Sequence, residues 1–343
     1  MPRDVRNAMR RTTLSTLPAI AIIAVALMSG GCSREASRAQ DARMKMGTIV
    51  GITVYGKDEA RAKAALEAAY VEIDRVEKLM SRYSENSEVS KLNKTGLTPF
   101  KASDELFMML IKSIDYSEIT GGAFDITVGP LMKVFRTSLE KGKAPDESAV
   151  ANAASRVGFR KISLDSSSKT VVFESDGMEI DLGAIAKGYA ADRAGAALKA
   201  VGAQSAIIDA GGDVLCVGSK PAGKPWTVAL RNPRDPEDFL LKLAVKDLAV
   251  TTSGDYEQYF ESNGKRFIHI MDPRTGKSAT GCISATVIAR TAMQADALST
   301  SICVLGPSDG IKLIESIDGV EALIVSQDRK LFRSSGFSKF EAD

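Results

Sequence analysis

The sequence is poor in cysteine, and the few cysteines it has are not spaced as metal ligands. Only four occur in 343 residues, and no two of them form a C-x-x-C pair. This spacing indicates neither a zinc site nor a disulfide framework. We expect Cys216, Cys282 and Cys303 to be buried free thiols, with a Cys216–Cys282 disulfide as the alternative in an oxidising compartment.

The chain also lacks an excess of charge of either sign. It has 45 Lys and Arg residues against 43 Asp and Glu residues. Residues 1–31 carry four of the arginines and a single aspartate, so the small basic excess belongs to that segment. The charge balance gives no reason to expect nucleic-acid binding, and the 44% hydrophobic content suits a packed core.

No apolar run has the length of an ordinary transmembrane helix. Residues 17–28 are apolar, but this is roughly a dozen residues where a span needs about 20. Four arginines precede the run and small residues follow it, which is the pattern of an export signal over residues 1–31. An uncleaved membrane anchor is the alternative.

Cys32 comes directly after two glycines at the end of this segment, and the arrangement resembles a bacterial lipobox. Such a cysteine is acylated after cleavage, and its acyl chains hold a protein at a membrane surface without a span. The match is imperfect because Ser29 stands where lipoboxes prefer leucine, so plain secretion is the alternative. Residues 32–43 are then expected to form a polar tether.

Apolar periodicity predicts a mixture of helices and strands over residues 44–343. Helices are predicted near 58–80, 103–119, 146–157, 183–202, 292–305 and 308–317. Strands are predicted near 46–56, 161–165, 170–174, 177–181, 205–218, 226–231, 241–247, 266–271, 283–290, 321–326 and 330–334. Because no short repeat and no Pro/Ser-rich linker interrupts this region, we expect one intimately packed α+β unit of one lobe or two.

Residues 181–192, DLGAIAKGYAAD, form a candidate anion site. Asp181 and Gly183 end a predicted strand, and Lys187 falls in the first turn of the helix that follows. An ammonium group and the N-terminus of a helix attract the same anion. The chain has neither the Walker spacing nor G-x-G-x-x-G, so an ordinary turn with a solvent-facing lysine is the alternative.

Two further stretches combine small and polar residues. Residues 120–130, TGGAFDITVGP, offer an adaptable backbone, the ring of Phe124 and the carboxylate of Asp125, although a helix end followed by a strand is the alternative. Residues 269–276, HIMDPRTG, begin with the only histidine, His269, beside a turn. A histidine at such a position is able to transfer protons, and a purely structural role is the alternative.

Asp296 is a lone carboxylate in the apolar stretch 289–306. Thr300 lies four residues further on, so a helix places both side chains on one face. Carboxylate and hydroxyl oxygens are ligands that Mg²⁺ accepts, with water and phosphate oxygens completing its coordination. The alternative is that Asp296 caps a helix or pairs with a basic residue.

These stretches occur in an order that resembles the FAD:protein FMN transferase family, the ApbE-type lipoproteins. The resemblance covers residues 46–306 and rests on eight blocks: MGT (46–48), MSRYSENSEVSKLN (80–93), GGAFDITVGPL (121–131), DLGAIAKGYAAD (181–192), IDAGGDVL (208–215), TTSGDYEQYF (251–260), HIMDPRTG (269–276) and ADALSTSICVLG (295–306). It implies an α+β, ApbE-type fold of two intimately packed α/β lobes, T-fold-like, with residues 44–343 as the catalytic domain.

The family resemblance also implies a reaction. Its members break the pyrophosphate of FAD with Mg²⁺, join the FMN part through its phosphate to a Thr hydroxyl of a target protein, and release AMP. Expected partners are extracytoplasmic flavoproteins of membrane electron-transfer complexes, with the enzyme lipid-anchored on the periplasmic side of the inner membrane. The outer membrane is the alternative, because Ser33 after Cys32 does not favour retention at the inner membrane. FAD hydrolysis to FMN and AMP, or flavin binding without catalysis, are the alternatives.

Site roles follow from the same resemblance. Contacts with the flavin nucleotide are implied for Met46, Tyr83, Ala123, Phe124, Asp125, Asp181 and Lys187. The implied Mg²⁺ ligands are the side chains of Asp296 and Thr300 and the main-chain oxygen of Ala184. His269 is the candidate base for the target Thr, and Asp181 is the reserve.

Overall fold

The computed structural model describes residues 36–342, and these belong to one compact unit. The predicted export signal and the predicted lipidation at Cys32 lie outside the described residues. No helix within residues 36–342 has the length and apolar character needed to cross a membrane.

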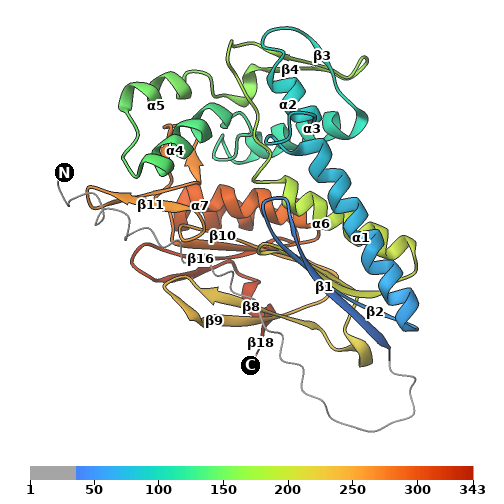
Figure 1. The fold of residues 1–343 in the computed structure, drawn as a ribbon. Coiled ribbons are helices and arrows are strands. Elements are labelled where there is room, and N and C mark those ends of the chain that lie inside the picture. Colours follow the sequence, from blue (N-terminus) through green and yellow to red (C-terminus); the bar gives the residue numbers. More distant parts are fainter. Residues whose placement is uncertain (1–35, 343) are drawn as a thin grey trace, which may run out of the picture. The chain divides into compact units, whose positions relative to one another are not determined.

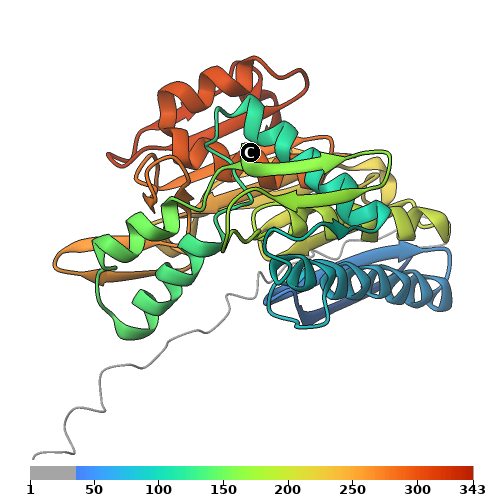
Figure 2. The same cartoon turned by 90° about the horizontal axis from the view of Figure 1, so that it is seen from above.

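An eight-stranded antiparallel sheet forms the centre of this unit (Figure 1). Its spatial order is β1-β2-β6-β7-β10-β15-β16-β17, so early and late parts of the chain lie at opposite edges, as Figure 2 shows. The strands are β1 Ser37–Lys45, β2 Thr48–Gly56, β6 Ser205–Ala210, β7 Asp213–Val217, β10 Ala249–Gly254, β15 Ser284–Ala289, β16 Glu321–Val325 and β17 Leu331–Arg333.

Strand β1 corrects the predicted tether over residues 32–43. From Ser37 onward this segment pairs along its whole length with β2, ending with Lys45 opposite Thr48. Its side chains alternate between more and less exposed, which is the period of a strand at the edge of a sheet. The polar composition reflects the exposed edge and not a free tether.

Three helices cover one face of the sheet (Figure 1): α1 Glu59–Met80, α6 Ala186–Ala200 and α7 Ala292–Glu315. The helix predicted over 58–80 is α1, and Asp58 caps it by accepting a hydrogen bond from the backbone N–H of Arg61. Between this layer and the sheet lies the main core. The break predicted between 305 and 308 appears as a kink in α7 at Gly306, which precedes Pro307.

Helices α6 and α7 approach so closely that only glycine fits at their crossing. A Cβ atom at Gly188 would lie 2.2 Å from the carbonyl oxygen of Ala292. We expect Gly188→Ala to lower the free energy of unfolding by about 2 kcal/mol, because backbone atoms have little room to retreat. Thermal melts check this against Gly51→Ala, where a Cβ meets no atom within 4 Å; equal melting temperatures for the two variants would contradict the expectation.

A smaller antiparallel sheet covers the opposite face. It consists of β8 Trp226–Asn232, β9 Asp235–Val245 and β18 Glu341–Ala342. Side chains of β7 alternate between the two cores, with Leu215 and Val217 facing the helices and Val214 and Cys216 facing this second sheet.

The remaining helices and short strands lie outside these layers (Figure 1): α2, α3, β3 and β4 gather beyond the C-terminal end of α1, whereas α4, α5 and β11 lie towards the left end of α7. The helices are α2 Glu88–Asn93, α3 Asp104–Ile119, α4 Gly129–Lys141 and α5 Glu147–Ala154. The strands are β3 Phe100–Lys101, β4 Ile162–Asp165, β5 Thr170–Phe173, β11 Tyr259–Ser262, β12 Lys265–Ile268, β13 Met271–Asp272 and β14 Lys277–Ser278.

The strand predicted over 177–181 is wrong, since this segment makes only one bridge, between Glu179 and Val128.

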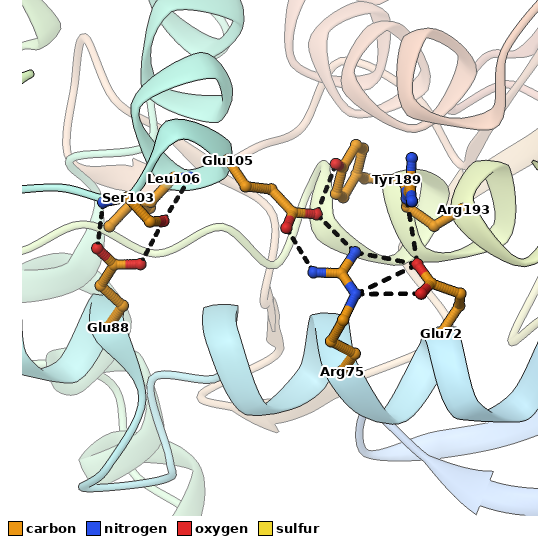
Figure 3. Close-up of polar contacts among 8 residues, drawn as sticks. All are labelled: Glu72, Arg75, Glu88, Ser103, Glu105, Leu106, Tyr189 and Arg193. Atoms are coloured by element: carbon orange, nitrogen blue, oxygen red, sulfur yellow. Dashed lines mark hydrogen bonds and ion pairs between the residues drawn. The ribbon is translucent and has the colours of Figure 1, made fainter.

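A network of ion pairs ties α1, α3 and α6 together (Figure 3). Arg75 on α1 pairs with Glu72 and with Glu105 of α3, and Glu105 also accepts a hydrogen bond of 2.6 Å from the Tyr189 hydroxyl. Arg193 of α6 closes the network on Glu72 at 3.2 Å. These contacts fix the first turns of α6, which carry Lys187.

Candidate flavin-transfer site

Lys187, Asp213 and Asp296 meet where α6, β7 and α7 converge. The Lys187 Nζ lies 3.0 Å from Oδ2 of Asp213 and 3.6 Å from Oδ2 of Asp296. Both carboxylates are almost fully buried, at 2% exposure each. One ammonium group therefore faces two buried acids that come from different parts of the chain.

Burial changes the protonation of these acids. It raises the pKa of Asp296 to about 7, with repulsion from Asp213 as the next cause and attraction from Lys187 opposing both. Burial also raises the pKa of Asp213, against the attraction of Lys187. For Lys187 burial acts in the opposite direction, but the two acids outweigh it and its pKa lies above the ordinary value. The ammonium is thus charged at neutral pH.

The N-terminus of α6 adds to this positive centre. Ile185 precedes the helix and makes no side-chain cap. Asp296 supplies a partner from α7 instead, since its Oδ2 accepts a hydrogen bond of 3.1 Å from the N–H of Gly188. The structure thus shows the capping and pairing that the sequence allowed as the alternative role of Asp296.

The oxygens at this point still fit a divalent cation. No described residue donates a hydrogen bond to Asp296 Oδ1, and Oδ2 of Asp213 is buried with no hydrogen bond of good geometry among the described residues. Within residues 36–342 no three His, Cys, Asp or Glu side chains gather as a ligand set. A hard cation would therefore need hydroxyl, carbonyl or phosphate oxygens beside the carboxylates, as Mg²⁺ accepts.

Thr300 and Ala184 lie close to these acids in the fold. Thr300 is one turn after Asp296 on α7, and its Oγ1 lies 3.3 Å from the Ser253 hydroxyl of β10. Ala184 stands in the turn before α6, next to Gly183, whose carbonyl accepts a hydrogen bond of 3.2 Å from Lys187 Nζ. The three predicted metal ligands therefore come from α7 and from the start of α6, which pack together.

Asp181 is held in a salt bridge beside the same turn. Arg82 lies 3.0 Å from its Oδ2, and both side chains are 11% exposed. Its Oδ1 accepts a hydrogen bond of 2.9 Å from the N–H of Gly183. Asp181 thus shapes the turn that precedes Lys187, and both of its oxygens are occupied.

Tyr83 presents an exposed aromatic ring next to this salt bridge. It is 78% exposed, and the guanidinium carbons of Arg82 and Arg136 lie 4.8 and 5.5 Å from its ring centre. The Arg136 Nη1 also donates a hydrogen bond of 3.2 Å to its hydroxyl. This combination of a flat ring and two cations suits a planar, anionic ligand.

Residues 123–125 are buried, so their side chains present little surface to a ligand. Asp125 accepts hydrogen bonds from the N–H and hydroxyl of Thr127 on Oδ1 and from the N–H of Phe159 on Oδ2. Phe124 is 2% exposed and packs edge-on against Tyr116. Their side chains therefore support the loop, and contact with a ligand from this loop stays a prediction.

Met46 lies in the turn between β1 and β2, and His269 lies between the short strands β12 and β13. Met46 has a φ of 51° in the β1–β2 hairpin, and the neighbouring Thr48 lies so close to Gly211 that a Cβ there would be 2.3 Å from its hydroxyl oxygen. His269 is half-buried, with Nδ1 3.3 Å from the carbonyl of Gln258. Burial is the main reason that the pKa of His269 falls to about 4, so its imidazole is neutral at pH 7.

Three features of the site were not predicted from the sequence. These are Asp213 as the partner of Lys187, and the two arginines, Arg82 and Arg136, that flank Tyr83. The block IDAGGDVL contained a signal for Asp213, because two glycines at positive φ turn β6 into β7 immediately before it. Arg82 directly precedes Tyr83 in the block MSRYSENSEVSKLN, whereas Arg136 gave no signal, since it meets Tyr83 only in the fold.

Cysteine pairing also differs from the expected alternative. All three described cysteines are buried and free, as predicted. Cys282, however, lies beside Cys303 in the main core, whereas Cys216 belongs to the second core. The Cys216–Cys282 disulfide is therefore wrong.

The sequence is similar to those of known proteins over most of its length. A family model described as the ApbE family matches residues 46–324. A Treponema pallidum protein named FAD:protein FMN transferase is 33% identical, with 88% of each chain covered, and its Haemophilus influenzae namesake is 31% identical, with 93% of this chain and 96% of that protein covered.

Solved structures agree with the sequence comparison and confirm the predicted fold class. The Thermotoga maritima ApbE protein superposes with a TM-score of 0.83 at 32% identity, covering 90% of this chain and all of that one. A Vibrio cholerae protein described as flavin transferase ApbE gives a TM-score of 0.79 at 26% identity, covering 89% and 99%. On a match that spans most of its length, the chain belongs to the ApbE family.

Proposed function

We propose that this protein transfers the FMN part of FAD, through a phosphoester bond and with Mg²⁺, to a Thr hydroxyl of a target flavoprotein and releases AMP. The observation that carries the proposal is the single ammonium of Lys187 facing two buried acids at the start of α6. The ammonium supplies the positive charge that attracts a pyrophosphate, and the carboxylates supply the negative charge that attracts its metal ion. Family membership and the names of the relatives support the same reaction.

Asp296, Thr300 and the main-chain oxygen of Ala184 would hold the metal ion. When bound, Mg²⁺ supplies positive charge to the pyrophosphate oxygens and orients them for transfer. Lys187, whose Nζ lies 3.6 Å from Asp296 Oδ2, would contribute a second positive charge, and the N–H groups at the start of α6 add their dipole. Asp213 keeps the ammonium in place between the two acids.

The flavin ring is proposed to stack on Tyr83. Its ring is open to solvent on the molecule's surface, and Arg82 and Arg136 give that surface positive charge. Stacking of this kind contributes about 1 kcal/mol beyond the buried area. Arg82 also anchors Asp181, which links the stacking surface to the turn before Lys187.

His269 is proposed as the base that accepts the proton of the target Thr. A neutral imidazole is able to accept a proton at pH 7, and the low pKa of His269 keeps it in that form. Asp181 is the weaker candidate because Arg82 and the N–H of Gly183 occupy its two oxygens.

The low pKa of His269 predicts an unusual pH profile. At saturating Mg²⁺, the ratio of kcat/KM between wild type and His269→Gln is expected to stay constant from pH 8 to pH 5. The reason is that the imidazole, with its pKa near 4, remains unprotonated throughout this range. Single-turnover rates at each pH check this. A ratio that falls towards one as the pH drops through 6.5 would show a histidine with an ordinary pKa.

The proposed location is the periplasmic side of the inner membrane, with acylated Cys32 as the anchor. The arginines and the apolar run within residues 1–31 support export, and the clients expected for the family lie at that membrane. The proposed clients are extracytoplasmic flavoproteins of membrane electron-transfer complexes.

A product analysis separates transfer from its alternatives. The protein is incubated with FAD, Mg²⁺ and an acceptor flavoprotein, and AMP, free FMN and protein-bound flavin are measured in one reaction. Transfer predicts AMP and bound flavin in equal amounts, and a Thr→Val acceptor yields neither in excess of background. Free FMN matching AMP would show a hydrolase, and bound FAD without AMP would show a binding protein.

A further inference from the structure

Cys282 and Cys303 lie in direct contact in the main core. Their Sγ atoms are 2.8 Å apart, and both residues are fully buried. Cys282 stands two residues before β15, while Cys303 lies on α7. The third described cysteine, Cys216, belongs to the other core and contacts neither of them.

The backbone around the pair is held on both sides. A Cβ atom at Gly281 would lie 2.5 Å from the carbonyl oxygen of Cys303 and 2.8 Å from the nitrogen of Gly306. The carbonyl of Cys282 accepts a hydrogen bond of 2.9 Å from the side chain of Gln327. The two thiols therefore meet because their main chains are packed together, and bonding needs a shift of less than about 1 Å.

We propose that Cys282 and Cys303 form an intramolecular disulfide in the mature protein, which cross-links the segment before β15 to α7. The proposal rests on the proposed export to an oxidising compartment. Two S–H bonds are lost and one S–S bond forms, while a disulfide oxidant takes the two electrons and two protons and becomes two thiols. Burial raises the pKa of the Cys282 thiol, so the exchange belongs to folding and the finished bond is shielded from reductants.

The cross-link would brace the face of α7 that carries Asp296 and Thr300 without involving either of these residues. Cys303 lies three residues after Thr300 and seven after Asp296, which places all three on neighbouring positions of one face of α7. The bond would close a loop between positions 21 residues apart and so restrict the unfolded chain. Its expected effect is on stability, with little effect on the chemistry.

Peptide mapping tests the bond directly. The full chain is produced with its own export segment, denatured, alkylated without reductant and digested. Mass spectrometry should then show Cys216 alkylated and the Cys282 and Cys303 peptides joined. A parallel sample, refolded from the reduced state with oxidised glutathione, should show the same link even if export fails. Full alkylation of Cys282 and Cys303 in the refolded sample, or a link to Cys216, would overturn the proposal.

Thermal melts with and without reductant supply an independent readout. Because the folded core shields the bond, the wild type is reduced in denaturant and refolded with reductant, and this should lower its melting temperature by about 5 °C relative to the oxidised protein. Cys216→Ala, the matched control, should respond as the wild type does, whereas Cys303→Ala should melt at one temperature under both conditions. Flavin transfer, measured separately at 25 °C, should stay within about twofold in Cys303→Ala. A wild type insensitive to reductant after the refolding step would contradict the cross-link, whatever the transfer assay shows.

Discussion

Replacing Asp296 by asparagine is expected to reduce flavin transfer by at least about 1000-fold while leaving the protein as stable as the wild type. Asn keeps the shape and the acceptor oxygen that faces the N–H of Gly188. It removes the negative charge that a metal ion needs. The expected loss is therefore in turnover and in metal binding, measured by AMP release and by calorimetric titration with Mg²⁺.

Stability is retained in this variant because the charge of Asp296 is costly in the metal-free fold. Burial and the nearby Asp213 raise the pKa of Asp296 to about 7. A neutral amide avoids both costs, so thermal melts without metal should show no loss. Asp309→Asn, an exposed change on the same helix, is the matched control and should keep full activity. Wild-type turnover in Asp296→Asn would refute the metal assignment.

Replacing Lys187 by methionine is expected to reduce transfer about 100-fold and to lower the free energy of unfolding by about 3 kcal/mol. Its ammonium is the cation between Asp213 and Asp296, at 3.0 and 3.6 Å. Without it two buried acids face each other uncompensated. Stability, which should fall in Lys187→Met and be retained in Asp296→Asn, thus distinguishes the two variants, although both lower activity.

Added Mg²⁺ gives a second distinction between the two variants. Removing Lys187 leaves the acids and hydroxyls that would hold a cation, so Mg²⁺ should raise the melting temperature of Lys187→Met. It should not do so in Asp296→Asn. Lys199→Met, at the exposed end of α6, is the control for loss of a lysine from this helix and should match the wild type. An unchanged melting temperature and activity in Lys187→Met would contradict its role.

Helices with strong apolar periodicity were predicted best from the sequence. The apolar spacing in α1 and α3 gave these helices within a residue or two, because one face of each is buried in the core. Helix α4 was missed since Gly129 and Pro130 suggest a turn, yet proline at the start of a helix loses no intrahelical bond. Strand β1 was missed because its edge position leaves it polar.

The sequence predicted the single residues of the site, but not that the fold brings them together. Lys187 was expected at a helix start and Asp296 on a helix face, and both occupy those places. Their meeting with Asp213 depends on three elements that are far apart in the chain, so no local pattern contained it. The same holds for Arg136, which reaches Tyr83 across 53 residues.

The most direct test of the central claim is flavin fluorescence of the acceptor after denaturing electrophoresis. Wild-type protein with FAD and Mg²⁺ should give a fluorescent acceptor band that survives denaturation. The same reaction with EDTA, or with Asp296→Asn in place of the wild type, should give none. A band of wild-type intensity in either of these two reactions would contradict transfer through a metal ion held by Asp296 beside Lys187.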